Sequence, residues 1–400
     1  MEMKKREIVF VKNCSSEIND FFLSKTSILT DLLLKEIDSV EAIVLEGSLG
    51  KGEGTYCQLD NGLVPLSDYD LTVVTRRPFL PPLRTYTSHD FEKLMGNHCS
   101  VLVIWKPLLR FVPPKITWYD IKFGSQTLHG NEKVLNLIPL RMSDHIPLEE
   151  GIRLLFNRIL DLLAAFDLSF ATERNNEDRI RLAYCCNKAT LAFGECLLLL
   201  RNRWNPRASA RNEMLEKEIF SESKRWSEPL LAIRNAVREA TFTKLNISPK
   251  SLNEIDTRTL WFDTQKLFNS FLKYYFEKWK GEKINSDRDL IDFMLKYDPP
   301  FSPHDRILAM LDFFTPSLSG RRSKAIAFTK NPMRLCLIVA YLLYTSVQRS
   351  AYFSLDIRRI AIAEDILKTY FPEMARYTSK SNRWSSAKAR LLEVAQIVKH

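Results

Sequence analysis

The sequence predicts an α+β protein in which an N-terminal α/β domain is followed by a large all-helical region. Over the first 145 residues, short β-branched runs alternate with segments whose apolar residues have helical spacing. After Pro147 the strand signals fade and helical spacing dominates. The chain of 400 residues is also longer than one hydrophobic core usually organises. We therefore expect a domain over residues 1–146 and a helical region over 147–400, with a possible division near 245–252.

The N-terminal domain is predicted to contain two helices, four buried strands and a hairpin. Apolar residues recur at helical spacing within Ser27–Ser39, and Ser88 can cap a short helix that ends at Met95. An Asp-Asn-Gly turn in the stretch TYCQLDNGLVPL predicts the hairpin. The strands are predicted at the short β-branched runs Ala42–Leu45, Leu71–Val74, Val101–Trp105 and Ile116–Phe123.

The remainder of the chain is predicted to be helical throughout. Leu148–Phe166 and Glu177–Arg203 are strong helical segments. Further helices are predicted at 212–243, 256–281, 287–296, 304–314, 331–347, 356–370 and 385–398. The longest apolar runs, Cys196–Leu200 and Leu335–Leu343, are far too short to span a bilayer. They predict buried helix segments, and no membrane partner is expected.

The net charge of +10 is unevenly distributed along the chain. Residues 1–150 carry a balance of −3, so the remainder carries +13. This asymmetry indicates either a phosphate-rich partner or simply a solvated basic surface. The seven cysteines are odd in number, scattered and without a CxxC pair, so neither a disulfide framework nor a zinc site is indicated. The N-terminus also lacks the apolar run of a signal peptide, so we expect a cytoplasmic protein.

Glycines are concentrated just ahead of an Asp-x-Asp pair. Five of the 12 glycines lie between Gly47 and Gly62. The stretch is not a Walker A loop, because Glu53 follows Gly52 where that motif needs Lys. It is not a dinucleotide fingerprint either, since Thr55 stands where the last glycine belongs. A Gly47-Ser48 turn would still let backbone N–H groups and a hydroxyl approach phosphate oxygens.

Asp68 and Asp70 are candidate metal ligands. On a strand the two side chains point to the same side, because the side-chain period is two. Two carboxylates held that close repel each other unless a cation lies between them, and hard oxygen ligands suit Mg²⁺ or Mn²⁺. Phosphates bridged by metal beside a glycine turn are typical of phosphoryl or nucleotidyl transfer.

The motif GSLGKGE followed by SDYDL resembles the nucleotidyltransferase signature of the DNA polymerase β-like superfamily. The residues in register with that signature are Gly47, Ser48, Lys51, Gly52, Glu53, Ser67, Asp68 and Asp70. The spacing between Ser48 and Ser67 is longer than in the smallest members, and the predicted hairpin accounts for the excess. Leu128-His129-Gly130 resembles the turn at which a late strand of such domains ends. The resemblance covers residues 40–140 and implies a polymerase β-like fold.

The resemblance also implies roles for individual residues. Asp68, Asp70 and a third carboxylate would bind the metals, and Asp120, on the predicted strand face of Ile116 and Trp118, is the acidic candidate for the third. Gly47, Ser48, Lys51 and Ser67 would lie at the nucleotide, with Ser67 orienting the loop. Lys188 could reach the triphosphate from the helical region, although a solvent-facing charge is the alternative.

These expectations describe a metal-dependent nucleotidyltransferase that moves an NMP from an NTP to a hydroxyl acceptor and releases pyrophosphate. A small molecule or a protein is the expected acceptor, because no RRM or KH signature is present, while nucleic acid remains compatible with the basic C-terminal part. Two alternatives stay open. The chain could be a non-catalytic nucleotide sensor or scaffold with this fold, or an RNA 3′-end nucleotidyltransferase.

Overall fold

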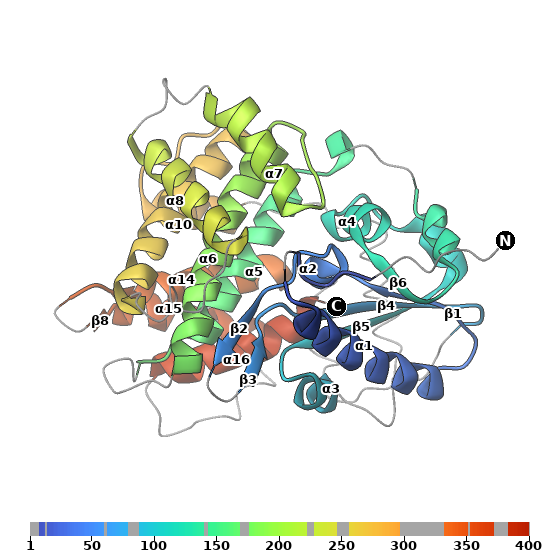
Figure 1. The fold of residues 1–400 in the computed structure, drawn as a ribbon. Helices are drawn as coiled ribbons and strands as arrows, with labels where there is room; N and C mark the ends of the chain where they lie inside the picture. The colour runs from blue at the N-terminus through green and yellow to red at the C-terminus, as the bar shows by residue number, and fades with distance from the viewer. Residues whose placement is uncertain are drawn as a thin grey trace. The chain divides into compact units, whose positions relative to one another are not determined.

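In the computed structural model the protein is α+β, with a small mixed sheet near the N-terminus followed by helices (Figure 1). The structure describes residues 8–12, 14–59, 62–78, 88–139, 143–168, 176–221, 228–245, 256–296, 332–350, 353–371 and 383–399. The predicted fold class is confirmed at this level of description.

The chain divides into two compact units, each assembled from separate stretches. The first unit comprises Met1–Gly151, Gly194–Trp226 and Arg234–Leu252. The second comprises Ile152–Phe193, Ser227–Ile233 and Asn253–His400. The sequence predicts consecutive domains that meet at residue 146, whereas these units interleave along the chain. Two stretches from the helical region therefore belong with the α/β part.

The sheet of the first unit has the strand order β5-β4-β1-β6. Its members are β1 (Val40–Leu45), β4 (Tyr69–Thr75), β5 (Cys99–Trp105) and β6 (Gln126–Gly130). Strand β1 pairs antiparallel with β4 and β6, and β4 runs parallel to β5. Leu45 lies opposite Leu71, so the chain that leaves β1 lies beside the chain that enters β4.

Helical elements cover both faces of this sheet (Figure 1). One face packs on α1 (Ser16–Glu36) and α3 (Ser88–Met95), and the other on α4 (Ile116–Gly124) and the 3₁₀ helices η1 (Lys106–Phe111) and η2 (Glu132–Leu137). Because side chains alternate along a strand, Ile43 and Leu45 enter the first core, while Ala42 and Val44 enter the second.

The same alternation along β4 determines which way its polar residues face. Tyr69, Leu71 and Val73 belong to the core under α1 and α3. The residues between them, Asp70 and Thr72, therefore point to the side of the sheet that carries α4.

Most predicted elements of the N-terminal part are confirmed. Strands β1, β4 and β5 each begin two residues before the predicted start. The hairpin forms from β2 (Tyr56–Leu59) and β3 (Gly62–Pro65), and β6 ends at Gly130 as expected. Helix α3 has the predicted bounds, while α1 begins earlier than predicted because its helical spacing of buried residues already starts at Phe22.

The predicted strand Ile116–Phe123 is wrong, because this segment is helix α4. Its β-branched and aromatic residues favour a strand locally. The place beside β1 is taken by β6, however, so the segment lies on the face of the sheet, where Ile121 is buried in the core. A short apolar run fits either period, and tertiary packing determines the outcome here. The predicted strand face shared by Ile116, Trp118 and Asp120 does not exist.

The helical segments largely match their predictions. Their bounds are α5 (Glu149–Ala165), α6 (Asn176–Leu200), α7 (Ala208–Met214), the π-helical turn η5 (Leu215–Ile219), α8 (Glu228–Leu245), α10 (Thr257–Lys280), α11 (Asp287–Lys296), α14 (Pro332–Ser346), α15 (Ile357–Tyr370) and α16 (Arg383–Lys399). The predicted helix 212–243 is thus divided into several elements, and 304–314 lies outside the described residues. The short elements η3 (Ser143–His145), β7 (Val347–Gln348) and β8 (Ser354–Leu355) were not predicted. In the described part of the chain, no helix has both the length and the apolar character that crossing a membrane needs.

The second unit is built around the apolar helix α14. Its run Leu335–Leu343 is buried, as predicted, and Trp384 donates its indole N–H to the Leu343 carbonyl over 3.0 Å. The rings of Phe166 and Trp261 stack with centroids 4.2 Å apart. Asp287 ties three helices together, because it pairs with Lys273 of α10 at 2.7 Å and with Arg359 of α15 at 2.9 Å.

We predict that Gly130→Ala destabilises the first unit more than Gly96→Ala does. Both glycines have a positive φ, near +83° and +75°, which costs an L-residue roughly 1–2 kcal/mol. A Cβ at Gly130 would also lie 2.0 Å from the Glu41 carbonyl oxygen, whereas one at Gly96 meets nothing within 4 Å among the described residues. Urea unfolding of the two variants measures the difference, and equal losses would contradict this close approach of β6 to β1.

Candidate functional site

The candidate site lies where β1 ends and β4 begins. The Glu46 N–H donates to the Asp70 carbonyl over 2.8 Å, which continues the strand pairing by one residue. Gly47 follows with φ near +61° and opens the short helix α2 (Gly47–Gly50). A Cβ at Gly47 would lie 2.8 Å from Oδ2 of Asp70. Glycine is therefore required both by the backbone conformation and by the closeness of the Asp70 carboxylate.

Ser48, the second residue of the predicted turn, is reached by a lysine that sequence reasoning missed. Lys244, near the end of α8, donates from Nζ to the Ser48 hydroxyl oxygen over 3.3 Å. The two residues are 196 positions apart in sequence but belong to the same compact unit. A cation from the helical part of the chain thus stands at the Gly47-Ser48 turn.

The two aspartates of the Asp-x-Asp pair have different surroundings. Asp70 lies in β4, and its Oδ1 accepts from the Ser100 hydroxyl on the neighbouring strand β5 over 2.7 Å. Asp68 precedes the strand and is half-buried. Between the predicted turn and the pair, Ser67 is buried, and its hydroxyl oxygen accepts the Thr55 N–H over 2.8 Å. This contact ties Ser67 to the residue before the hairpin, and its expected place at the nucleotide stays a prediction.

Asp120 approaches from helix α4, on the face of the sheet toward which Asp70 points. Its Oδ2 pairs with Lys51 Nζ at 2.5 Å, and its Oδ1 accepts the indole N–H of Trp204 over 2.8 Å. Only 11% of the Lys51 side chain and 15% of the Asp120 side chain are exposed. Both carboxylate oxygens of Asp120 are therefore engaged by side chains in this arrangement.

The segment 204–211 holds these residues in place. Trp204 is buried, and Arg211 lies over its ring with the guanidinium carbon 5.1 Å from the centroid. Arg211 also pairs with Glu195 at 2.6 Å and donates to the carbonyls of Asn205 and Pro206. These contacts hold the segment in one conformation and join it to α6. The position of Trp204, which donates to Asp120, is fixed in this way.

Glu53, which sequence alone cannot tell from a solvated loop charge, ties the glycine-rich loop to this segment. Its carboxylate accepts the N–H groups of Ala208 and Ser209, over 2.7 and 3.1 Å, and the Ser209 hydroxyl over 2.9 Å. Burial acts to raise the pKa of Glu53, but these hydrogen bonds outweigh it and leave the pKa below its ordinary value. The carboxylate caps the first turn of α7.

Glu46 is a further carboxyl group in the site. It accepts a hydrogen bond from the Thr72 hydroxyl, on the same face of the sheet as Asp70. Burial raises the pKa of Glu46 to about 8 against the opposing effect of that hydrogen bond. The charges of Asp70 and Asp120 raise it further, while that of Lys51 lowers it. The two aspartates and Lys51 therefore all lie near enough to act on one carboxyl group.

Lys188, the predicted triphosphate ligand, lies in the second unit. It stands 3.9 Å from Asp161 in an ion pair, and its Nζ lies 5.5 Å from the centroid of the Tyr184 ring. The structure brings together Gly47, Ser48, Lys51, Asp70 and Asp120 within the first unit. A role for Lys188 at the nucleotide stays a prediction.

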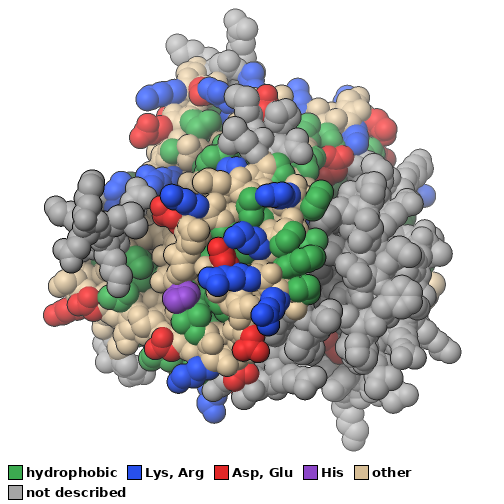
Figure 2. Space-filling model, turned by 90° about the vertical axis from the view of Figure 1, so that its right-hand side faces the viewer, with side chains coloured by type: hydrophobic (Ala, Val, Ile, Leu, Met, Phe, Trp, Pro, Cys, Tyr) green, Lys and Arg blue, Asp and Glu red, His purple; other side chains and the backbone are tan. Residues whose placement is uncertain are grey.

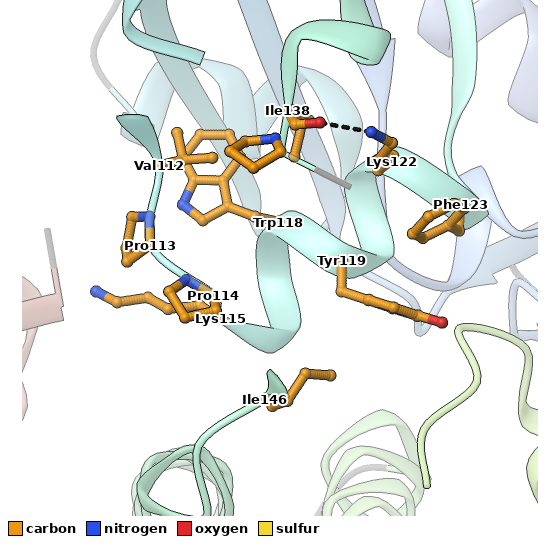
Figure 3. Close-up of a pocket in the computed structure, with 11 residues that line it drawn as sticks. Val112, Pro113, Pro114, Lys115, Trp118, Tyr119, Lys122, Phe123, Ile138 and Ile146 are labelled. Carbon is orange, nitrogen blue, oxygen red and sulfur yellow. Dashed lines mark hydrogen bonds between the residues drawn. The ribbon is translucent and has the colours of Figure 1, made fainter. Parts of the chain in front are cut away.

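A pocket is lined by residues of α4 and of the segments before and after it (Figure 3). It is lined by aromatic, proline and aliphatic side chains together with Lys115 and Lys122, and the lining does not include Asp120. Lys122 donates to the Ile138 carbonyl over 2.5 Å, and burial lowers the pKa of its ammonium group. Helix α4 thus carries Asp120 toward Lys51 and Trp204, and other side chains toward the pocket.

Comparison with known proteins adds no relative. No protein-family model matches the sequence, and no curated protein matches it significantly. Any assignment has to rest on the residues of the site themselves.

The carboxylates differ in how well they fit a divalent cation. Asp70 has one oxygen bonded to Ser100 and the other close to the Gly47 backbone, and with Asp68 it offers the hard oxygens that Mg²⁺ or Mn²⁺ prefers. Asp120 instead holds a lysine and an indole N–H. In the part of the chain that the structure describes, no group of three or more His, Cys, Asp or Glu side chains is gathered as for a metal. Asp68 and Asp70 are thus ligands of the type that the expected ion prefers, whereas Oδ2 of Asp120 is occupied by Lys51.

Three residues of the site were missed by sequence reasoning. Glu46 carried a weak signal, since it stands between an apolar strand and the Gly47-Ser48 turn. A charged residue at the end of a buried strand needs a polar partner or water, so it is expected near the turn. Trp204 stands in the stretch WNPRASA, which reads only as a break between helices. Lys244 carried no local signal, because its contact with Ser48 is made entirely by tertiary structure.

We predict that Glu46→Gln removes part of the pH dependence of stability. A pKa of about 8, above the ordinary 4.5, means that the folded protein binds this proton more tightly than the unfolded chain. The contribution of Glu46 is therefore fully present below pH 4.5 and is lost as the pH rises through about 8. Gln stays neutral, so the free energy of unfolding of the variant should fall less over this window. Urea titrations at several pH values measure it, and parallel curves for the two proteins would contradict the prediction.

Proposed function

We propose that the protein is a metal-dependent nucleotidyltransferase with a polymerase β-like fold in its α/β part. It would transfer an NMP group from an NTP to a hydroxyl acceptor and release pyrophosphate. The observation that carries the proposal is the meeting of Gly47, Ser48, Asp70 and Lys244 at the paired ends of β1 and β4. A glycine turn, a hydroxyl, a carboxylate and an ammonium group are what a metal-bound triphosphate requires.

The phosphate side of the site would be formed by the turn and its lysine. The Ser48 hydroxyl and the backbone around Gly47 can donate to phosphate oxygens, since Gly47 carries no side chain that would block the approach. Lys244 already stands at Ser48 and would offset the negative charge of the β- and γ-phosphates. Ser67 contributes by holding the loop through Thr55.

The metal side would be formed by Asp68 and Asp70. When bound, the cation supplies neutralisation of phosphate charge and a lower pKa for the acceptor hydroxyl. Ser100 fixes the orientation of Asp70 through its hydrogen bond to Oδ1. Asp120 would join the ligands, and could accept the proton of the acceptor hydroxyl, only where its bond to Lys51 is broken.

One observation favours a second candidate function, a nucleotide sensor or scaffold that binds an NTP without transferring it. Both oxygens of Asp120 are engaged by Lys51 and Trp204. Asp68 and Asp70 alone could hold a metal-bound triphosphate, whereas activating an acceptor needs a further carboxylate. The two functions differ in whether NTP binding is followed by release of pyrophosphate.

The acceptor is proposed to be a small molecule or a protein, in the cytoplasm. The odd number and scattered positions of the seven cysteines suit a reducing compartment. Nucleic acid, including an RNA 3′ end, is the alternative acceptor that the charge of +10 keeps open. On the face that Figure 2 shows, Lys and Arg side chains lie beside exposed hydrophobic ones, an arrangement that suits several anionic partners.

We predict that Asp68→Asn combined with Asp70→Asn abolishes transfer and leaves the fold intact. The protein is incubated with Mg²⁺ or Mn²⁺ and each labelled NTP, with metabolites, protein and RNA offered separately. Label in one fraction identifies the acceptor class, and binding without label in any fraction favours the sensor. The matched control is Asp20→Asn with Asp31→Asn, at exposed positions of α1. Full transfer by the site variant would rule out this assignment of the aspartates.

We predict that Lys244→Met weakens NTP binding by about 1.5–3 kcal/mol, the range for a hydrogen bond to a charged group. The reason is its contact with the Ser48 hydroxyl. Lys188→Met is the matched variant, because it removes the lysine that the sequence alone suggests. Calorimetric titration with a non-hydrolysable NTP measures both affinities. If Lys188→Met weakens binding and Lys244→Met does not, the sequence-based assignment is right and ours is wrong.

A further inference from the structure

Lys51 and Asp120 form an ion pair that is largely shielded from water. The exposed fractions of their side chains are 11% and 15%. The stem of Lys51 runs across Gly124, where an added Cβ would lie 3.3 Å from Cγ and 3.4 Å from Cε of the lysine. The absence of a side chain at Gly124 gives the lysine its path to the carboxylate.

Lys51 contacts one acidic side chain directly and acts on another. Its ammonium group pairs with Asp120, and its charge acts on Glu46 against those of Asp70 and Asp120. A carboxylate as shielded from water as that of Asp120 needs a positive charge nearby. Lys51 supplies such a charge.

The same lysine is one helical turn from the proposed phosphate site. The Lys51 N–H donates to the Gly47 carbonyl over 3.2 Å, so its backbone is fixed beside the Gly47-Ser48 turn. A flexible four-carbon stem lets an ammonium group point to either of two nearby anions. Asp120 and a bound triphosphate would be two such anions.

Asp120 is held in position independently of the lysine. Its Oδ1 accepts from Trp204, which is buried and packed under Arg211. If Lys51 leaves, the carboxylate keeps this bond and its place, and Oδ2 becomes available to another cation.

We propose that Lys51 is an internal cation that a divalent metal displaces from Asp120, and that the released ammonium group then binds the triphosphate. The inference rests on the proposed function, because a metal-bound NTP is the ligand that supplies both exchanging partners. Lys51 thereby couples the metal subsite to the phosphate subsite. While the ion pair is formed, Oδ2 of Asp120 would be unavailable to a metal, until a divalent cation displaces the ammonium group.

If the exchange occurs, Lys51→Gln should raise the affinity for Mn²⁺ and lower the affinity for an NTP. Without the competing ammonium group, Mn²⁺ binds the protein alone more tightly, by roughly ten- to hundredfold, the factor that a hydrogen bond to a charged group represents. At saturating Mn²⁺, an NTP binds more weakly by a similar factor, because a phosphate ligand is lost. An ion pair with a purely structural role would leave both affinities unchanged or weaken both.

The experiment measures Mn²⁺ binding by electron paramagnetic resonance and NTP binding by calorimetry. Lys51→Arg is the matched control, since it keeps the charge at Asp120 and should leave the Mn²⁺ affinity near that of the wild type. The gain in Mn²⁺ affinity from Lys51→Gln should disappear when Asp120→Asn is added, because the gain acts through that carboxylate.

A measurement on the unaltered protein covers the case in which Lys51→Gln does not fold. Amine-reactive labelling, read by mass spectrometry, reports how accessible Lys51 is. Labelling of Lys51 should rise when Mn²⁺ alone is added and fall again when an NTP follows. Labelling that Mn²⁺ leaves unchanged would overturn the exchange.

The outcomes separate this inference from the proposed function. If the wild-type protein binds neither Mn²⁺ nor an NTP, the proposed function fails. If it binds both, but Lys51→Gln weakens Mn²⁺ binding or leaves it unchanged, the exchange is wrong and the proposed function is unaffected.

Discussion

The antiparallel pairing of β1 with β4 is the interaction on which the candidate site depends. It places Leu45 opposite Leu71, and the next pair along joins the Glu46 N–H to the Asp70 carbonyl. The glycine turn that follows β1 therefore lies against the carboxylate of Asp70, the second residue of β4, although the two are separated in sequence by a hairpin. A shift of this register by one residue would send Asp70 into the core under α1 and α3 and remove it from the site.

The remaining residues of the candidate site come from the helical part of the chain, far from the sheet in sequence. Trp204 holds Asp120, Ala208 and Ser209 hold Glu53, and Lys244 reaches Ser48. The Lys51 ion pair then stands between the part of the site built on strands and the part built on helices. The side chains of Lys51 and Asp120 are both largely shielded from water, so their charges are weakly screened. A cation that replaced Lys51 would therefore change the electrostatic potential at Asp120 strongly.

The sequence predicts much of the sheet, because Ala42–Leu45 and Leu71–Val74 are buried β-branched runs whose pattern allows little else. The Asp-Asn-Gly turn predicts the hairpin. The motif GSLGKGE followed by SDYDL predicts that Gly47 and Asp70 are neighbours. The prediction fails at Ile116–Phe123, where a short apolar segment fits both periods and only the occupied place beside β1 decides. Lys244 and Trp204 could not be found, since long-range contacts of this kind leave no local pattern.

The Glu53 link to α7 has a consequence for how this protein can be divided or recombined. A chain that ended at residue 146 would retain Glu53 and Asp120 but lose Ala208, Ser209 and Trp204, which donate to their carboxylates. Asp120 would keep only Lys51, and the half-buried Glu53 would lose the donors of Ala208 and Ser209, a costly loss for a shielded charge. The α/β part is accordingly not a portable module. Any exchange of it between proteins, in evolution or in the laboratory, would have to carry the stretch 204–211 along.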